Sequence, residues 1–180
     1  DVTFMAEPEA AAIANGALEQ PGQLGLIVDI GGGTSDFTLF RTTDAGINTL
    51  ANHGVRIGGT DFDRAISIDR VMPLLGRGTE LRNQFGSGTH TAPAAIFNDL
   101  ATWEKIPFLY TAQTRRAVDD MLRQAQAPDQ IARLAEVLRD ELGHDIAFAV
   151  EKGKIQSNQP DHPAPRIDLK ELERGLIVPP

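Results

Sequence analysis

Three consecutive glycines at positions 31–33 constrain this chain more than any other feature, because they interrupt two runs of strand-like sequence. The first run ends in a carboxylate at Asp29, and the second follows a hydroxyl at Thr34 and a carboxylate at Asp36. Apolar or alternating runs bounded by glycine are typical of strands joined by a tight turn. Glycine has no Cβ, so we expect this turn to adopt backbone conformations that other residues avoid and to aim several amides at one anion.

The two carboxylates beside the turn indicate the kind of ligand. Asp29 and Asp36 repel a bare phosphate, whereas a divalent metal ion between them and the phosphate makes both groups favourable. We therefore interpret the segment as a hairpin that binds a metal–nucleotide phosphate. An ordinary glycine-rich hairpin with two exposed aspartates is the alternative.

Two further segments are candidates for the same site. Glu7 lies between a short apolar run and an alanine-rich helix start, where it is either an N-terminal helix charge or a third acid beside the hairpin. Gly58 and Gly59 precede a helix that we expect Thr60 to cap, and a helix N-terminus that follows glycines suits an anion. A plain strand-to-helix turn explains these two glycines equally well.

Charge and composition exclude several classes of function. The formal net charge is −8, from 25 acidic and 17 basic residues without a basic run, which disfavours nucleic acid as a partner. The absence of cysteine excludes disulfides and thiolate metal sites, and the four histidines lack the spacing of a zinc site. No apolar run approaches the roughly 20 residues that span a bilayer, so we expect no membrane partner. The lack of cysteine suits a reducing compartment, and we expect a cytoplasmic location.

Hydrophobic periodicity predicts a strand-rich first part and a helical remainder. In the first part we expect a strand at 2–5, a helix at 9–14, and an antiparallel meander of three strands, the last at 47–55. In the remainder we expect a helix opening at Thr60, a loop at 76–95, helices at 96–109, 113–126 and 129–155, and a strand at 167–169. The core of the helical part is expected to contain Trp103, Phe108 and Tyr110.

Three motifs occur in a fixed order, at residues 7–12, 29–36 and 58–63. Their order and spacing resemble the nucleotide-binding domain of the seventy-kilodalton heat-shock chaperones of the DnaK type, within the actin and sugar-kinase superfamily. The resemblance covers residue 1 to about residue 72. The segment 76–145 looks closer to a divergent bacterial branch of Hsp-like proteins.

The resemblance implies an α/β fold, namely part of an actin-like (ribonuclease H-like) ATPase lobe with an antiparallel β-meander and a mostly helical cap subdomain. Residues 1–57 would be the base of the second lobe, with strand 2–5 belonging to the first lobe, and residues 58–180 would be the cap. The first phosphate loop would precede residue 1, and the second adenosine-binding segment would follow residue 180. We therefore expect a fragment that neither hydrolyses ATP measurably nor binds it tightly.

The resemblance also implies roles for the site residues. Asp29 would hold Mg²⁺ through water, Asp36 would help to orient the attacking water, and Glu7 would be the catalytic acid next to the metal. The β- and γ-phosphates of ATP would be cradled by four residues of the turn: Gly31, Gly32, Gly33 and Thr34. The nucleotide phosphates would be approached from the second lobe by Gly58 and Gly59.

A second pair of residues concerns the nucleoside. Glu151 and Lys154 lie one helical turn apart, and from the residues alone they are a solvated ion pair. The resemblance matches them to the acid and the lysine of the family's adenosine-binding helix. Ile155 stands where the family has an arginine that stacks on adenine, and Asn158 where it has a serine, two departures that bear on adenine affinity and selectivity.

The leading expectation for function is the ATP-binding half-site of a chaperone-like ATPase. The partners implied for the full-length protein are ATP or ADP with Mg²⁺, unfolded client proteins and co-chaperones. A carbohydrate kinase or exopolyphosphatase of the same superfamily is one alternative, and a regulatory protein that binds nucleotide without hydrolysing it is another.

Overall fold

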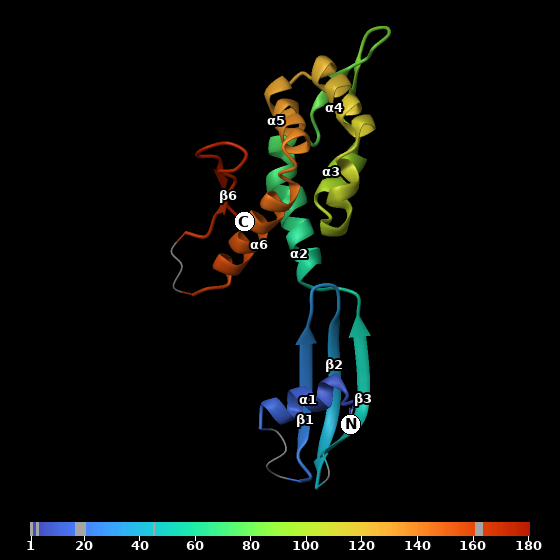
Figure 1. Ribbon diagram of the computed structural model, residues 1–180, viewed down its shortest axis with the longest axis vertical. Coiled ribbons are helices and arrows are strands. Elements are labelled where there is room, and N and C mark those ends of the chain that lie inside the picture. The colour runs from blue at the N-terminus through green and yellow to red at the C-terminus, as the bar shows by residue number, and fades with distance from the viewer. Residues whose placement is uncertain (1, 3, 17–20, 45, 161–163) are drawn as a thin grey trace. The chain divides into compact units, whose positions relative to one another are not determined.

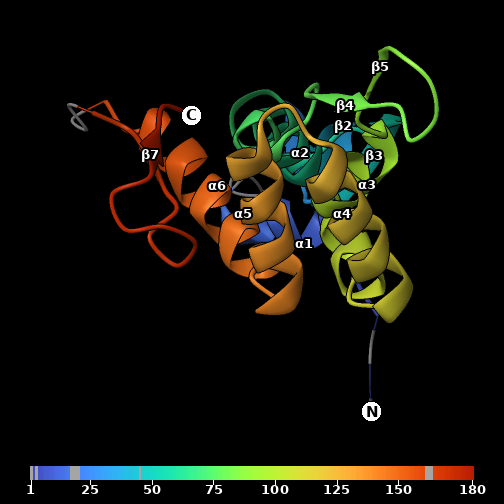
Figure 2. The same ribbon diagram turned by 90° about the horizontal axis from the view of Figure 1, so that it is seen from above.

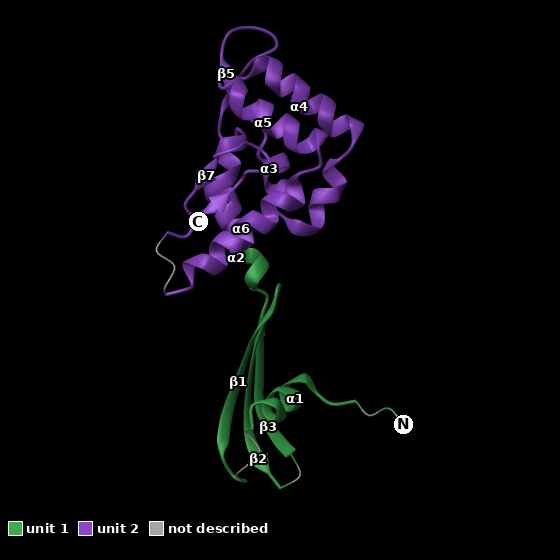
Figure 3. Ribbon diagram, turned by 60° about the vertical axis from the view of Figure 1, so that its left-hand side comes forward, with its two compact units in different colours: residues 1–61 green, residues 62–180 purple. Residues whose placement is uncertain are grey.

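The computed structural model describes residues 2, 4–16, 21–44, 46–160 and 164–180 (Figure 1). The chain forms two units, residues 1–61 and residues 62–180, which Figure 3 shows in different colours. The boundary falls inside helix α2 (Gly59–Ile66). The assignment of 1–57 to the base of a chaperone lobe and of 58–180 to its cap stays a prediction.

The first unit is built on a three-stranded antiparallel sheet in the order β1-β2-β3, which confirms the expected meander. Its strands are β1 (Leu24–Ile30), β2 (Ser35–Thr43) and β3 (Gly46–Val55). Helix α1 (Glu7–Ala14) lies across one face of the sheet (Figures 1 and 3). It begins with a proline in its first turn and is rich in alanine, as expected of a helix start. Ala12 of α1 and Phe40 of β2 are buried.

The expected strand at 2–5 is wrong for the residues that the structure describes there. Val2, Phe4 and Met5 are in no strand, and residue 3 lies outside the described residues. Val2 and Phe4 are 85% and 95% exposed. An apolar run forms a strand only when a neighbouring strand completes its hydrogen bonds, and no described strand lies beside this one.

The second unit is helical and contains the main apolar core of the chain. Its α-helices after α2 are α3 (Ala94–Leu100), α4 (Ala112–Gln124), α5 (Pro128–Arg139) and α6 (Gly143–Ser157), and a 3-10 helix at Trp103–Leu109 lies between α3 and α4. Helices α4 and α5 pack side by side (Figure 2), and fully buried residues from several segments, such as Val71, Phe97 and Leu138, meet in the core. After α2 the chain continues as a π-helical turn (Ser67–Val71) and a 3-10 turn (Met72–Leu75).

The long helix expected at 129–155 is two helices, α5 and α6, separated at residues 140–142. Glu141 has a positive φ of 59°, which ends α5. The Tyr110 hydroxyl donates to the Glu141 carbonyl (3.0 Å) and accepts from the Gly143 amide (3.0 Å). A Cβ on Gly143 would lie 2.6 Å from Ile106 Cγ2, so only glycine lets α6 start this close to its neighbours.

Of three smaller expectations for the second unit, one is confirmed and two need correction. The strand expected at 167–169 is confirmed as β6 (Ile167–Asp168), which pairs with β7 (Ile177–Val178). The loop expected at 76–95 contains a hairpin of β4 (Glu80–Arg82) and β5 (Thr89–Thr91). Trp103 and Phe108 are exposed rather than in the core, whereas Tyr110 is half-buried.

No helix in the described ranges has the length and apolar content needed to cross a membrane.

Candidate functional site

The glycine turn joins β1 to β2 at one end of the sheet. The pairing of the two strands places Asp29 opposite Asp36 and Ile30 opposite Ser35. The amide of Gly31 then donates to the Thr34 carbonyl at 2.8 Å and closes the turn. Residues 31–34 are all exposed. The predicted hairpin is therefore present, with one carboxylate on each strand beside it.

The three glycines do not adopt the left-handed backbone conformations that favour glycine, so the expectation fails for those conformations. Gly31, Gly32 and Gly33 all lack a positive φ. A Cβ on Gly33 would meet nothing within 4 Å, and one on Gly32 would meet only Thr60 Cγ2, at 3.8 Å. Neither backbone strain nor internal packing therefore requires glycine at positions 32 and 33. Glycine there keeps the space outside the turn open.

Two carbonyls of the turn are occupied, whereas three of its amides have no acceptor among the described residues. The Gly31 carbonyl accepts from the Gly59 amide (2.9 Å), and the Gly32 carbonyl accepts from the Thr60 amide (2.8 Å) and hydroxyl (2.7 Å). Among the described residues, no acceptor pairs with the amides of residues 32–34. Several unpaired N–H groups on an exposed turn form an electropositive surface that suits an anion.

Gly58 is required for a close approach between two backbone segments. A Cβ at this position would lie 2.3 Å from the Gly32 carbonyl oxygen and 2.6 Å from the Gly33 amide nitrogen. The Gly58 amide donates to Asp61 Oδ2 at 2.9 Å. Asp61, rather than Thr60, thus accepts at the start of α2, because the Thr60 hydroxyl donates to the hairpin. The nucleotide-binding roles of Gly58 and Gly59 stay predictions.

The three acids expected at the site line one pocket. Glu7 from α1, Asp29 from β1 and Asp36 from β2 border a pocket of about 790 Å³ within the first unit, together with Thr38, Phe40 and Asn52. All three acids are exposed. The structure therefore brings Glu7 to the same pocket as the two aspartates. The sequence alone did not decide between this position and a simple charge at the start of a helix.

This donor set fits Mg²⁺ better than a metal held wholly by protein. No group of three or more His, Asp or Glu side chains in the described residues has the geometry to enclose a metal ion. Mg²⁺ keeps several waters and is commonly bound by one or two carboxylates together with phosphate oxygens. Asp29 and Asp36, opposite one another beside the amides of the turn, fit that mode.

Sequence reasoning missed Gly54, which pairs with Asp36 across β2 and β3. A Cβ on Gly54 would lie 2.6 Å from Asp36 Oδ1, so this glycine makes room for the carboxylate. A glycine inside a strand, which often marks such a close approach, was the available signal.

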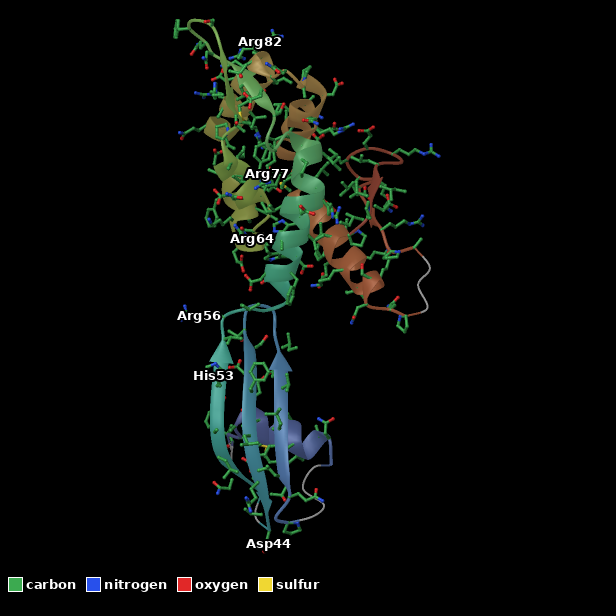
Figure 4. All side chains as sticks on the ribbon, turned by 180° about the vertical axis from the view of Figure 1, so that it is seen from behind. Asp44, His53, Arg56, Arg64, Arg77 and Arg82 are labelled. Atoms are coloured by element: carbon green, nitrogen blue, oxygen red, sulfur yellow. The ribbon has the colours of Figure 1, made fainter. Side chains whose placement is uncertain are left out.

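Ser35 was also missed as an anchor: its hydroxyl donates to the Ile57 carbonyl at 2.7 Å. Figure 4 shows Arg56 at the hairpin end of the sheet and Asp44 at the opposite end.

The expected nucleoside residues belong to the second unit. Lys154 Nζ lies 2.7 Å from Asp63 Oδ2, so this lysine forms an ion pair with a residue of α2. Glu151 is exposed and borders a shallow pocket of about 390 Å³ with Phe148 and Ile155. Ile155 is half exposed, at 50%, and presents an apolar side chain there.

Comparison with known proteins connects the hairpin to a family. A family model described as Hsp70 protein matches residues 2–72, the segment that contains α1, the hairpin and α2. The chaperone protein dnaK3 of Thermosynechococcus vestitus is 32% identical over 143 residues, which covers 74% of this chain and 21% of the relative. The chain thus spans about a fifth of the length of the curated relative that it matches. The family match and this relative together support an Hsp70-family fragment, with the family model matching residues 2–72.

Proposed function

We propose that this chain is part of the nucleotide-binding domain of an Hsp70-type chaperone and forms one side of its ATP–Mg²⁺ site. The observation that carries the proposal is the exposed turn at 32–34, whose amides have no acceptor among the described residues and whose neighbours are two carboxylates. Unpaired amides bind phosphate oxygens, and the carboxylates bind the cation that accompanies the phosphate.

The roles proposed for the site residues are those that the resemblance to the family implies. Asp29 would hold Mg²⁺ through water, and the turn with Gly58 and Gly59 would hold the phosphates. Asp36 would orient the attacking water, and Glu7 would act as the catalytic acid. Bound Mg²⁺ supplies neutralisation of the phosphate charge, so the protein contributes mainly positioning and electrostatic stabilisation.

The proposal extends to the architecture and setting of the whole protein. Residues 1–57 would be the base and 58–180 the helical cap of one lobe of an actin-like ATPase, located in the cytoplasm. ATP hydrolysis in the full-length protein would drive closure between lobes, with unfolded clients and co-chaperones as partners. Glu151 and Lys154 would contact the adenosine part of the nucleotide.

The test is substitution of Asp29 in the full-length protein that contains these residues. Asp29→Asn removes the charge that holds the cation, so we expect phosphate release from ATP to be lost. Asp44→Asn is the matched control, because this exposed aspartate lies at the opposite end of the same sheet (Figure 4). Unchanged phosphate release in Asp29→Asn would overturn the proposal. A wild-type protein that binds ATP without releasing phosphate would instead be a nucleotide-binding regulator.

A further inference from the structure

A partly buried ion pair links two helices of the second unit that lie far apart in the sequence. Lys154 Nζ on α6 and Asp63 Oδ2 on α2 are 2.7 Å apart, and the two residues are separated by 91 positions. The side chains are 26% and 22% exposed. The other carboxylate oxygen, Asp63 Oδ1, is buried and has no hydrogen-bond partner among the described residues. The ion pair with Lys154 is therefore the principal compensation for the partly buried charge of Asp63.

This geometry is costly if it serves stability alone. A buried carboxylate oxygen without a partner loses its hydration and gains nothing in return. A well-packed apolar pair in the same place is often at least as stable as a buried ion pair. The ion pair does, however, restrict the lysine, because a donor committed to Asp63 limits where the other N–H groups of the ammonium can point.

We infer that Asp63 is a positioning residue that orients Lys154 toward the nucleoside of the bound nucleotide. The inference rests on the proposed function, in which Lys154 contacts adenosine. Lys154 on α6 forms an ion pair with a residue of α2, so the position of its ammonium is tied to α2 as well as to its own helix. Asp63 itself does not contact the ligand in this scheme, and its effect on binding passes through Lys154.

The experiment compares two ligands in the full-length protein, both with Mg²⁺: ADP, which carries a nucleoside, and inorganic tripolyphosphate, which does not. Asp63→Asn removes the negative charge that accepts from Lys154 at 2.7 Å, so we expect the affinity for ADP to fall about tenfold and the affinity for tripolyphosphate to stay unchanged. Asp69→Asn is the matched control, because Asp69 is an exposed aspartate on the next helical turn. It should change neither affinity.

A charge swap separates positioning from a structural role. The double variant Asp63→Lys with Lys154→Asp restores an ion pair between the helices but moves the cation to α2. We expect its thermal midpoint to recover toward that of the wild type while its ADP affinity stays low. Recovery of both would show that the pair is structural only and would overturn the inference.

Two further outcomes are informative. If Asp63→Asn does not fold, Asp63→Glu keeps the charge and displaces the ammonium by one methylene, and a loss of ADP affinity without a loss of tripolyphosphate affinity supports positioning. Equal ADP affinity in the wild type and in either Asp63 variant would overturn the inference and leave the proposed function intact. A wild-type protein that binds neither ligand would overturn both.

Discussion

At the scale of single residues, the site contains several glycines, and the physical reason for glycine differs from one position to the next. Gly33 has open space around its Cβ position, whereas a Cβ on Gly58 would overlap the backbone of residue 32. Gly54 makes room for the carboxylate of Asp36. Under the proposed function the first kind of glycine leaves room for a ligand, whereas the other two serve the fold of the hairpin and its acids.

This difference predicts opposite results for two alanine substitutions. Gly33→Ala should change the free energy of unfolding by no more than about 0.5 kcal/mol, as for other exposed positions. In the full-length protein it should lower ATP affinity about tenfold or more, because the methyl group occupies space meant for the phosphates. Calorimetric titration and chemical denaturation measure the two quantities.

Gly58→Ala is the contrasting variant. Overlap with the Gly32 carbonyl should destabilise the chain by about 1–3 kcal/mol or more, whether or not nucleotide is present. If Gly33→Ala destabilised the chain as much as Gly58→Ala, the glycines of the turn would be structural and the assignment of the turn to a ligand would be wrong.

The sequence alone predicted that these glycines form a turn, but it did not predict why each position requires glycine. Consecutive glycines between strand-like runs predicted the hairpin correctly. The absence of a positive φ at 31–33 and the approach of Gly58 to the turn depend on contacts that sequence patterns do not contain. The pairing of Asp63 with Lys154, 91 residues apart, is of the same kind.

At the scale of elements, the junction between α5 and α6 depends on one side chain. The Tyr110 hydroxyl bonds both the Glu141 carbonyl and the Gly143 amide, and Glu141 is held at a positive φ. Apolar residues continue at helical spacing across this junction, which is why the sequence predicted one helix. Spacing reports which face is buried and carries no information on a local change of backbone direction.

Tyr110→Phe should destabilise the chain by about 1–3 kcal/mol, because it leaves two backbone groups without their partner. Burial raises the pKa of Tyr110 above its ordinary value of 10.0, and the hydrogen bond from Gly143 opposes part of this rise. Because the folded pKa is above the unfolded one, this contribution to stability is complete below about pH 10 and is lost as the pH rises through the folded pKa.

The pH dependence can be measured directly, because Tyr110 is the only tyrosine of the chain. Near-ultraviolet absorbance of tyrosinate should show ionisation above pH 10 in the folded chain and nearer to pH 10 in denaturant. The stability difference between wild type and Tyr110→Phe should shrink as the pH rises through that range. Ionisation at the same pH in both states would contradict the account.

At the scale of the whole molecule, the proposed function assigns one set of phosphate-binding groups to this chain. Catalysis by positioning requires groups on both sides of a nucleotide, and this chain spans about a fifth of its curated relative. We therefore expect calorimetry on the 180-residue chain with ATP and Mg²⁺ to show no tight binding, and phosphate assays to show no measurable hydrolysis. Micromolar ATP binding by this chain would contradict the expectation.

The most direct test of the central claim follows the amides of residues 32–34 in the full-length protein. Hydrogen–deuterium exchange at these amides is measured with and without ATP and Mg²⁺. The Gly143 amide, which donates to the Tyr110 hydroxyl, serves as an internal reference. The account predicts that exchange at 32–34 slows when ATP binds and that the reference is unchanged. Saturating ATP binding with unaltered exchange at 32–34 would contradict it, because the phosphates would then be held elsewhere.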